Sequence, residues 1–333
     1  MKKKMTLVFV FVFFALFFFG QPINAASINI KVGHDMAENS PHHEAALKWK
    51  ELVEQRTKGQ IAVKVFPAQL LGTGTEMVEM LQANALEVGI IPSAKVAPIV
   101  PSIQILDLPF LFPSREVCYK IIDGKVGEEI LKPLRDKNIE GVCFWESGFK
   151  QLTGMFPIRK PADYKGKKIR VMPAPVIMEQ FKAFGATPVP LDFAELYNAL
   201  QQRVVDGQEN PLVTNIVMKF YEVQKYFTIS DHAYLSYVFM ISKKFLESLP
   251  GETQKILVEA GKEAGRYQRS LIAGNEKGYL ETIKKAGDEI IYLTPAERKL
   301  FEEASRPVYQ WFAGKYGDQI LKAVNQEIEK ARK

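Results

Sequence analysis

The side chains best suited to holding an anion lie in two short stretches near the middle of the sequence. Arg170 interrupts the apolar run at 169–172, and its planar fork of donors fits a carboxylate better than any other side chain. Most arginines on strands only face solvent. Arg170 is therefore either a solvent-facing side chain or a ligand for a carboxylate, and both interpretations stay open. The second stretch, 204–211, reads VVDGQENP and follows a strongly helical segment. It is either turn chemistry alone or a turn whose amides, Asn210 among them, face a ligand.

Further polar and aromatic side chains stand where predicted strands end. His34 and Asp35 follow the first strand, Ser93 follows the third, and Trp145 and Lys150 end a later one. Ligands of open α/β sheets bind beyond the carboxyl ends of the strands. We therefore expect these residues to contribute to a binding site.

The sequence contains none of the short motifs of hydrolases or nucleotide-binding enzymes. HExxH, GxSxG, the P-loop and CxxC are all missing. His42 and His43 are adjacent on a predicted helix, so they point about 100° apart and do not converge on one metal ion. The sequence predicts a protein that is not an enzyme and needs no metal or cofactor. The remaining enzymatic alternative is a secreted metal-dependent hydrolase that uses His34, Asp35 and His232.

The first 25 residues have the form of a secretory signal peptide. Three lysines at positions 2–4 precede an uncharged apolar run, and small residues follow at Ala25 and Ala26. The apolar run is about 15 residues, shorter than the roughly 20 of a membrane-spanning helix. We therefore expect export to the periplasm with cleavage near Ala25.

Charge and cysteine content narrow the possible partners. Part of the formal net charge of +6 belongs to the signal peptide, and no cluster of basic residues with interleaved aromatics indicates nucleic acid. Cys118 and Cys143 permit one disulfide in an oxidising compartment, although two separate buried thiols are the favoured interpretation.

The elements that must position these residues alternate between strand and helix, which predicts an α/β fold with a parallel, helix-covered sheet. A second alternation begins after GFKQLTG and includes a helix over 192–207 that starts with a capping box of Asp192 and Glu195. The chain is longer than a single core usually takes, so two lobes are expected. The predicted division is 26–147 with 236–275 for lobe I and 148–235 with 276–333 for lobe II. Residues 251–287 can form one helix of about 30 residues that runs along both lobes.

Residues 163–211, DYKGKKIRVMPAPVIMEQFKAFGATPVPLDFAELYNALQQRVVDGQENP, resemble the signature region of the solute-binding proteins of tripartite ATP-independent periplasmic (TRAP) transporters. The segments DLPFLF, GFKQLT and VQKYFTISDHAYLSY also fit, so the resemblance covers nearly the whole chain. It implies a two-lobed periplasmic binding protein fold with a ligand cleft between the lobes. It also implies a small organic acid as ligand, delivered to a sodium-driven permease with a small four-helix and a large multi-helix membrane protein, although a sensor is an alternative partner.

The resemblance also implies roles for individual residues. Arg170 makes a two-pronged salt bridge to the ligand carboxylate, Asn210 assists it, and Phe193 packs on the carbon body of the ligand. Many members have a second arginine in the segment written GFKQLT here, where this chain has Lys150. That lysine resembles the branch that takes C4-dicarboxylates such as succinate, fumarate or malate. A sugar acid or a hydroxy or aromatic acid is the alternative.

Overall fold

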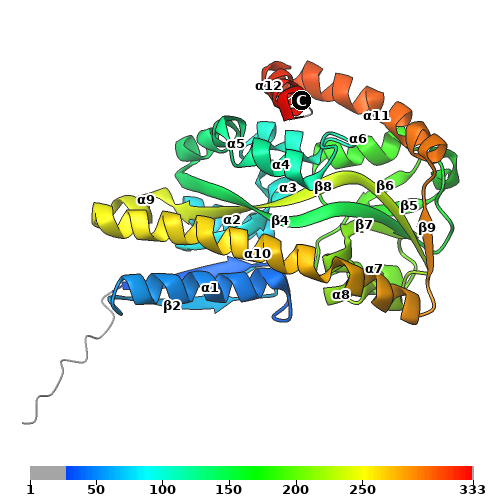
Figure 1. Cartoon of the computed structure of the whole chain (residues 1–333). Coiled ribbons are helices and arrows are strands. Elements are labelled where there is room, and N and C mark those ends of the chain that lie inside the picture. Colours follow the sequence, from blue (N-terminus) through cyan, green and yellow to red (C-terminus); the bar gives the residue numbers. More distant parts are fainter. Residues whose placement is uncertain (1–27, 332–333) are drawn as a thin grey trace, which may run out of the picture.

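The computed structural model describes residues 28–331, which form an α/β molecule around one continuous sheet (Figure 1). The predicted signal peptide lies outside the described residues. The strand order is β2-β1-β3-β8-β4-β7-β5-β6, and β9 pairs with β8. The strands are β1 (Ile28–His34), β2 (Ile61–Phe66), β3 (Val88–Pro92), β4 (Ile139–Gly154), β5 (Lys168–Val171), β6 (Thr187–Pro190), β7 (Gly207–Pro211), β8 (Tyr226–Ser242) and β9 (Glu289–Tyr292).

Two long strands, β4 and β8, join the two halves of the sheet. They pair antiparallel from Ile139 with Ser242 to Gly154 with Tyr226. At one end β1 is parallel to β2 and β3, and at the other β5 is parallel to β6 and β7. The α/β class is thus confirmed, but the prediction of a parallel sheet is wrong for its centre. Strand and helix alternation could not reveal that β4 and β8 each cross both halves.

The long helix α10 (Gly251–Lys285) confirms the prediction of a helix that runs along both halves (Figure 1). It packs against α1 (Pro41–Arg56) near its start and against α8 (Leu212–Val217) further along. Glycines allow its close approach to the sheet. A Cβ on Gly261 would lie 2.9 Å from the ring of Phe239, and one on Gly265 would lie 2.8 Å from the ring of Trp145.

Several of the remaining α-helices have capped N-termini, among them α11, where Thr294 and Glu297 form a capping box. The remaining α-helices are α2 (Gly74–Gln82), α3 (Ser93–Val96), α4 (Arg115–Ile122), α5 (Lys125–Leu131), α6 (Pro175–Ala183), α7 (Leu196–Gln201), α9 (Lys243–Glu247), α11 (Pro295–Tyr316) and α12 (Gln319–Ala331). Short 3-10 turns lie between them: η1 (Pro101–Asp107), η2 (Lys132–Lys137), η3 (Pro161–Tyr164) and η4 (Phe220–Glu222). Helix α12 packs on α4 and α5, whereas the predicted division assigns α12 to lobe II and α4 and α5 to lobe I. The lobe boundaries themselves stay a prediction.

Two local predictions between β6 and β7 are wrong. The capping box of Asp192 and Glu195 is not formed, because the Asp192 carboxylate accepts a hydrogen bond from the Ala194 N–H at 3.1 Å and α7 begins only at Leu196. In addition, residues 207–211 are not a turn but strand β7, between β4 and β5. A Cβ at Gly207 would lie 2.2 Å from the Thr153 carbonyl oxygen, so glycine there reflects close strand packing.

Candidate functional site

Arg170 lies on β5 as a buried cation, and not all of its N–H donors are used within the protein. Its neighbours Ile169 and Val171 are buried in the core, and Arg170 itself is only 1% exposed. Its Nε and Nη2 donate to the Leu191 carbonyl oxygen at 3.1 and 3.0 Å, and within residues 28–331 its Nη1 has no hydrogen-bond partner. Burial lowers the pKa of Arg170 to about 10, against the nearby carboxylates, so the guanidinium stays charged at neutral pH. The chemistry of its remaining donors suits an anion such as a carboxylate.

Two other predicted residues gather around Arg170. The Phe193 ring centroid lies 6.0 Å from the Arg170 Cζ, close enough for a cation–π contact. Arg170 is in register with Gln208 of the adjacent strand β7, and Asn210 lies two positions further on the same face. The Asn210 Nδ2 donates to the Gln208 Oε1 at 2.5 Å. The structure thus places Arg170, Asn210 and Phe193 in one region, and their predicted contact with a ligand stays a prediction.

Asp35, directly after β1, belongs to the same region. Its Oδ1 accepts a hydrogen bond from the Tyr237 hydroxyl of β8 at 3.0 Å. Burial raises the pKa of Asp35 to about 6, against this hydrogen bond and the charge of Lys95. Asp35 and Tyr237 are also among the groups whose charges act on Arg170. The side chains that β8 and the end of β1 contribute to this region are therefore polar and include the carboxyl group of Asp35.

His34 and Ser93 are buried near strand ends, as predicted, but both bond to other protein groups. The His34 Nε2 lies 3.0 Å from the His43 Nδ1, while its Nδ1 has no partner, and burial lowers the pKa of His34 to about 3. The Ser93 hydroxyl donates to Asp107 at 3.4 Å and accepts from Ser236 at 3.1 Å. Their predicted contact with a ligand stays a prediction.

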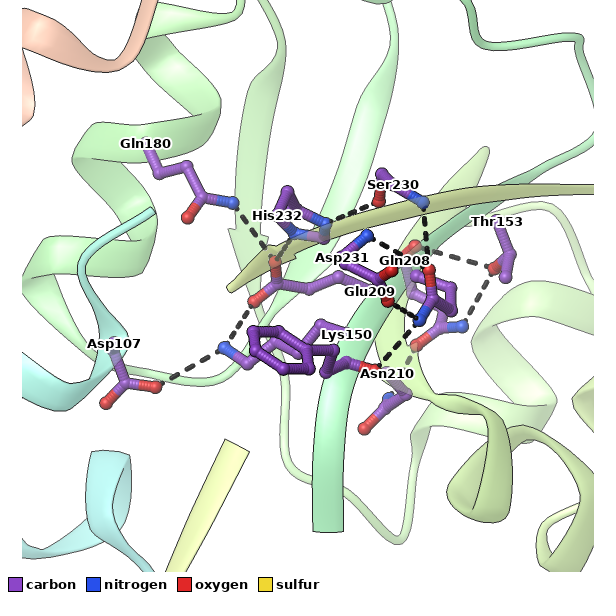
Figure 2. Close-up of polar contacts among 12 residues, drawn as sticks. Asp107, Lys150, Thr153, Gln180, Gln208, Glu209, Asn210, Ser230, Asp231 and His232 are labelled. Atoms are coloured by element: carbon purple, nitrogen blue, oxygen red, sulfur yellow. Dashed lines mark hydrogen bonds and ion pairs between the residues drawn. The ribbon is translucent and has the colours of Figure 1, made fainter. Parts of the chain in front are cut away.

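Lys150 forms a buried ionic network within the protein (Figure 2). Its Nζ lies 2.8 Å from Glu209 Oε1 and 3.3 Å from Asp107 Oδ1, and the side chain is 1% exposed. The other Glu209 oxygen bonds to His232 at 2.6 Å and to Gln180 at 3.1 Å. Although burial opposes charge on both, the pairing raises the pKa of Lys150 and lowers that of Glu209. The Lys150 charge is thus balanced inside the protein.

The pleat also separates Lys150 from Arg170. In the β4–β7 ladder Lys150 pairs with Pro211, so it shares a face with Glu209, two positions along β7. Asn210 and the register partner of Arg170, Gln208, point to the opposite face. The structure therefore does not place Lys150 beside Arg170 on one face of the sheet. Its predicted contact with a second ligand carboxylate stays a prediction.

Trp145 lies between the sheet and α10, and in the β4–β8 ladder it pairs with Tyr237. Its Nε1 donates to the Gly261 carbonyl oxygen at 3.1 Å, and its ring stacks on Phe239 with centroids 5.4 Å apart. Trp145 is fully buried, because the glycines of α10 leave room for its ring. These contacts place the Trp145 ring in the core, and its predicted contact with a ligand stays a prediction. The helical spacing of Gly261 and Gly265 is the sequence signal that could have indicated this.

Sequence reasoning missed the ionic partners in the site. Glu209 stands in the QENP motif and Asp107 precedes LPFLF, so both lay in recognised motifs, but their pairing with Lys150 required the fold. The ion pair between Lys95 and Asp192, at 2.9 Å, had no sequence signal at all.

The remaining open alternatives concern metals and thiols. His34 bonds to His43 while His232 bonds to Glu209, and in the part of the chain that the structure describes no group of three or more such side chains could hold a metal ion. Cys118 and Cys143 are both free thiols in the described structure, Cys118 buried and Cys143 partly buried. Burial raises the pKa of Cys143 to about 12.

Comparison with known proteins shows the class of the protein, a two-lobed solute-binding protein. The model of bacterial extracellular solute-binding protein family 7 matches residues 32–315, so the chain belongs to this family of TRAP solute-binding proteins. Its members bind substrates for transporters and are not enzymes. Between Ile28 and Ala331, no helix combines the length and apolar composition needed to cross a membrane.

Relatives of known name differ in the acid they bind. The 2,3-diketo-L-gulonate-binding periplasmic protein YiaO of Escherichia coli is 35% identical over 305 residues, 90% of this chain and 92% of that protein. The C4-dicarboxylate-binding periplasmic protein DctP of Rhodobacter capsulatus is also 35% identical over 305 residues, 91% of this chain and 92% of that one. A TRAP solute-binding protein of Sulfurospirillum deleyianum, solved with bound succinate, is 35% identical with a TM-score of 0.86, covering 90% of this chain and 99% of that one.

Proposed function

We propose that this protein captures a small organic acid by clamping one carboxylate on Arg170. The observation that carries the proposal is the buried, charged guanidinium whose Nη1 has no partner within the described residues. A charge-assisted hydrogen bond contributes roughly 1.5–3 kcal/mol net. Three such bonds, from Arg170 and Asn210, would approach the roughly −8 kcal/mol of a micromolar site.

The protein then acts in the periplasm, after removal of the signal peptide near Ala25, and delivers the acid to a small and a large TRAP membrane subunit. The family membership supports this assignment. The bound acid shifts the equilibrium between open and closed lobes toward the closed form, since only the closed form lets it contact residues of both.

We further propose that the preferred acid carries one carboxylate and several hydroxyl groups. Arg170 is the cation whose donors are available, whereas the ammonium of Lys150 is balanced by Glu209 and Asp107. Asp35 and Tyr237 present oxygen atoms that suit the hydroxyl groups of a sugar acid. An ionised Asp35 would repel a second carboxylate. YiaO, whose name gives a sugar-acid derivative as its ligand, supports this class.

A C4-dicarboxylate is the second candidate. The name of the Rhodobacter relative and the succinate in the Sulfurospirillum structure favour it. The second carboxylate would then need Lys150 or Lys95 to exchange a protein carboxylate for that of the ligand.

Calorimetry with two acids of equal chain length separates the candidates. D-erythronate carries one carboxylate and three hydroxyl groups, while succinate carries two carboxylates and no hydroxyl group. After copurified acid is removed by unfolding and refolding, we expect D-erythronate to bind at least tenfold more tightly than succinate at neutral pH. The uncharged polyol erythritol is the control and should not bind. Tighter binding of succinate would favour the dicarboxylate candidate, and a broad panel of organic acids without any binding would refute the proposed function.

A further inference from the structure

An ion pair connects α3, which follows β3, with the loop that follows β6. The Lys95 Nζ lies 2.9 Å from Asp192 Oδ2, and the two side chains are 3% and 23% exposed. In the sheet, β3 and β6 are separated by β8, β4, β7 and β5. In the predicted division, Lys95 belongs to lobe I and Asp192 to lobe II. The pair therefore joins the two halves of the sheet, between which the predicted cleft would lie.

Asp192 is the middle residue of the segment 191–193, and its two neighbours in this segment contact Arg170. The carbonyl oxygen of Leu191, just before it, accepts both hydrogen bonds of the Arg170 guanidinium. Phe193, just after it, places its ring 6.0 Å from Arg170. Asp192 of the ion pair is thus directly bonded in sequence to both residues that contact Arg170, the proposed carboxylate-binding residue.

Asp192 is held in place and kept ionised. Its Oδ1 accepts the Ala194 N–H at 3.1 Å, which leaves Oδ2 for Lys95. Burial disfavours the charge, but the hydrogen bonds from Lys95 and Ala194 and the charge of Lys95 lower the pKa of Asp192 below its ordinary value. The pair is therefore formed at neutral pH.

We propose that Lys95 is a positioning residue, whose ion pair with Asp192 closes the cleft and fixes residues 191–193 so that Arg170 retains the bound acid. This inference rests on the proposed function of Arg170. When the lobes separate, both charges return to water, so the pair favours the closed form alone. Loss of one partner of a buried pair leaves the other charge uncompensated and acts mainly on dissociation.

The first test measures binding and dissociation of D-erythronate by intrinsic tryptophan fluorescence in a stopped-flow instrument. Lys95→Met and Asp192→Asn should each raise the dissociation rate constant about tenfold while the association rate constant changes less than threefold. The reversed pair, Lys95→Asp with Asp192→Lys, should recover at least half of the loss on a logarithmic scale. Lys182→Met is the matched control, because Lys182 forms an exposed pair with Glu179, and it should bind as the wild type does.

The second test needs no acid. Small-angle scattering of the acid-free protein should show that Lys95→Glu and Asp192→Lys are each more open than the wild type, because like charges then face each other across the cleft. The reversed pair should restore the wild-type curve. These curves test the ion pair even if no acid in the panel binds, a result that would refute the proposed function alone.

Three results would overturn the inference. The first is a dissociation rate within twofold of the wild type for both single variants. The second is loss of binding in Lys95→Met while Asp192→Asn binds normally, which would make Lys95 a direct ligand contact. The third is identical scattering of the charge-reversal variants and the wild type.

Discussion

Replacing Arg170 with lysine keeps the positive charge at the proposed clamp but removes its geometry. The Nε and Nη2 of the guanidinium donate to the Leu191 carbonyl oxygen, and Nη1 remains to donate to a ligand. All donors of a lysine ammonium lie on one nitrogen atom. It therefore cannot bond to the Leu191 carbonyl oxygen and also donate to both oxygens of a carboxylate in one plane. At least one charge-assisted hydrogen bond is lost, which costs about 1.5–3 kcal/mol, or roughly a 10- to 150-fold rise in Kd.

Isothermal titration of D-erythronate into wild-type and Arg170→Lys protein measures this change, and thermal unfolding of the acid-free proteins checks that the variant is folded. Arg159→Lys is the control, because Arg159 is 49% exposed and pairs with Glu297 at the surface. An exposed pair contributes at most about 1 kcal/mol to stability, and this one should leave the Kd unchanged. A folded Arg170→Lys protein with a Kd within twofold of the wild type would refute the proposed clamp.

Three further changes test the surroundings of the site. Since the pKa of Asp35 is raised from 3.8 to about 6, the folded state holds this proton more tightly than the unfolded chain does. The resulting stabilisation is complete below pH 4 and is lost as the pH rises to 6, by about 3 kcal/mol, and Asp35→Asn should flatten this slope in urea titrations across that range. Gly265→Ala places a methyl group against the ring of Trp145 and should lower the free energy of unfolding by about 1–3 kcal/mol in denaturant titration, unlike Gly274→Ala, where nothing lies within 4 Å. Lys150→Met leaves the buried Glu209 carboxylate without its cation and should cost about 3–5 kcal/mol in the same assay, and a loss under 1 kcal/mol would contradict the buried network.

Much of the fold could be predicted because local patterns govern it. The side chains of Ser40 and Thr294 cap the starts of α1 and α11, and each cap involves residues only three positions apart in the sequence. The predictions of a parallel sheet centre and of a turn at 207–211 were wrong for another reason. Strand partners are set by contacts distant in sequence, and the short polar stretch GQENP is a strand only because β4 and β5 flank it.

The candidate site was predictable only where a motif carried it. Arg170, Asn210 and Phe193 were inferred from the resemblance, and the structure brings them together. Lys150 was expected to face a ligand, yet two carboxylates distant in sequence balance its charge. Whether an ionic side chain is free or paired depends on residues that only the folded chain brings near.

A crystal structure of the protein with the acid that copurifies would show directly whether Arg170 holds the ligand. We expect a carboxylate whose oxygens lie about 2.7–2.9 Å from the Arg170 guanidinium, with Nη1 among the donors. A bound acid whose carboxylates contact Lys150 or another group, while Arg170 bonds only to the Leu191 carbonyl oxygen, would contradict it.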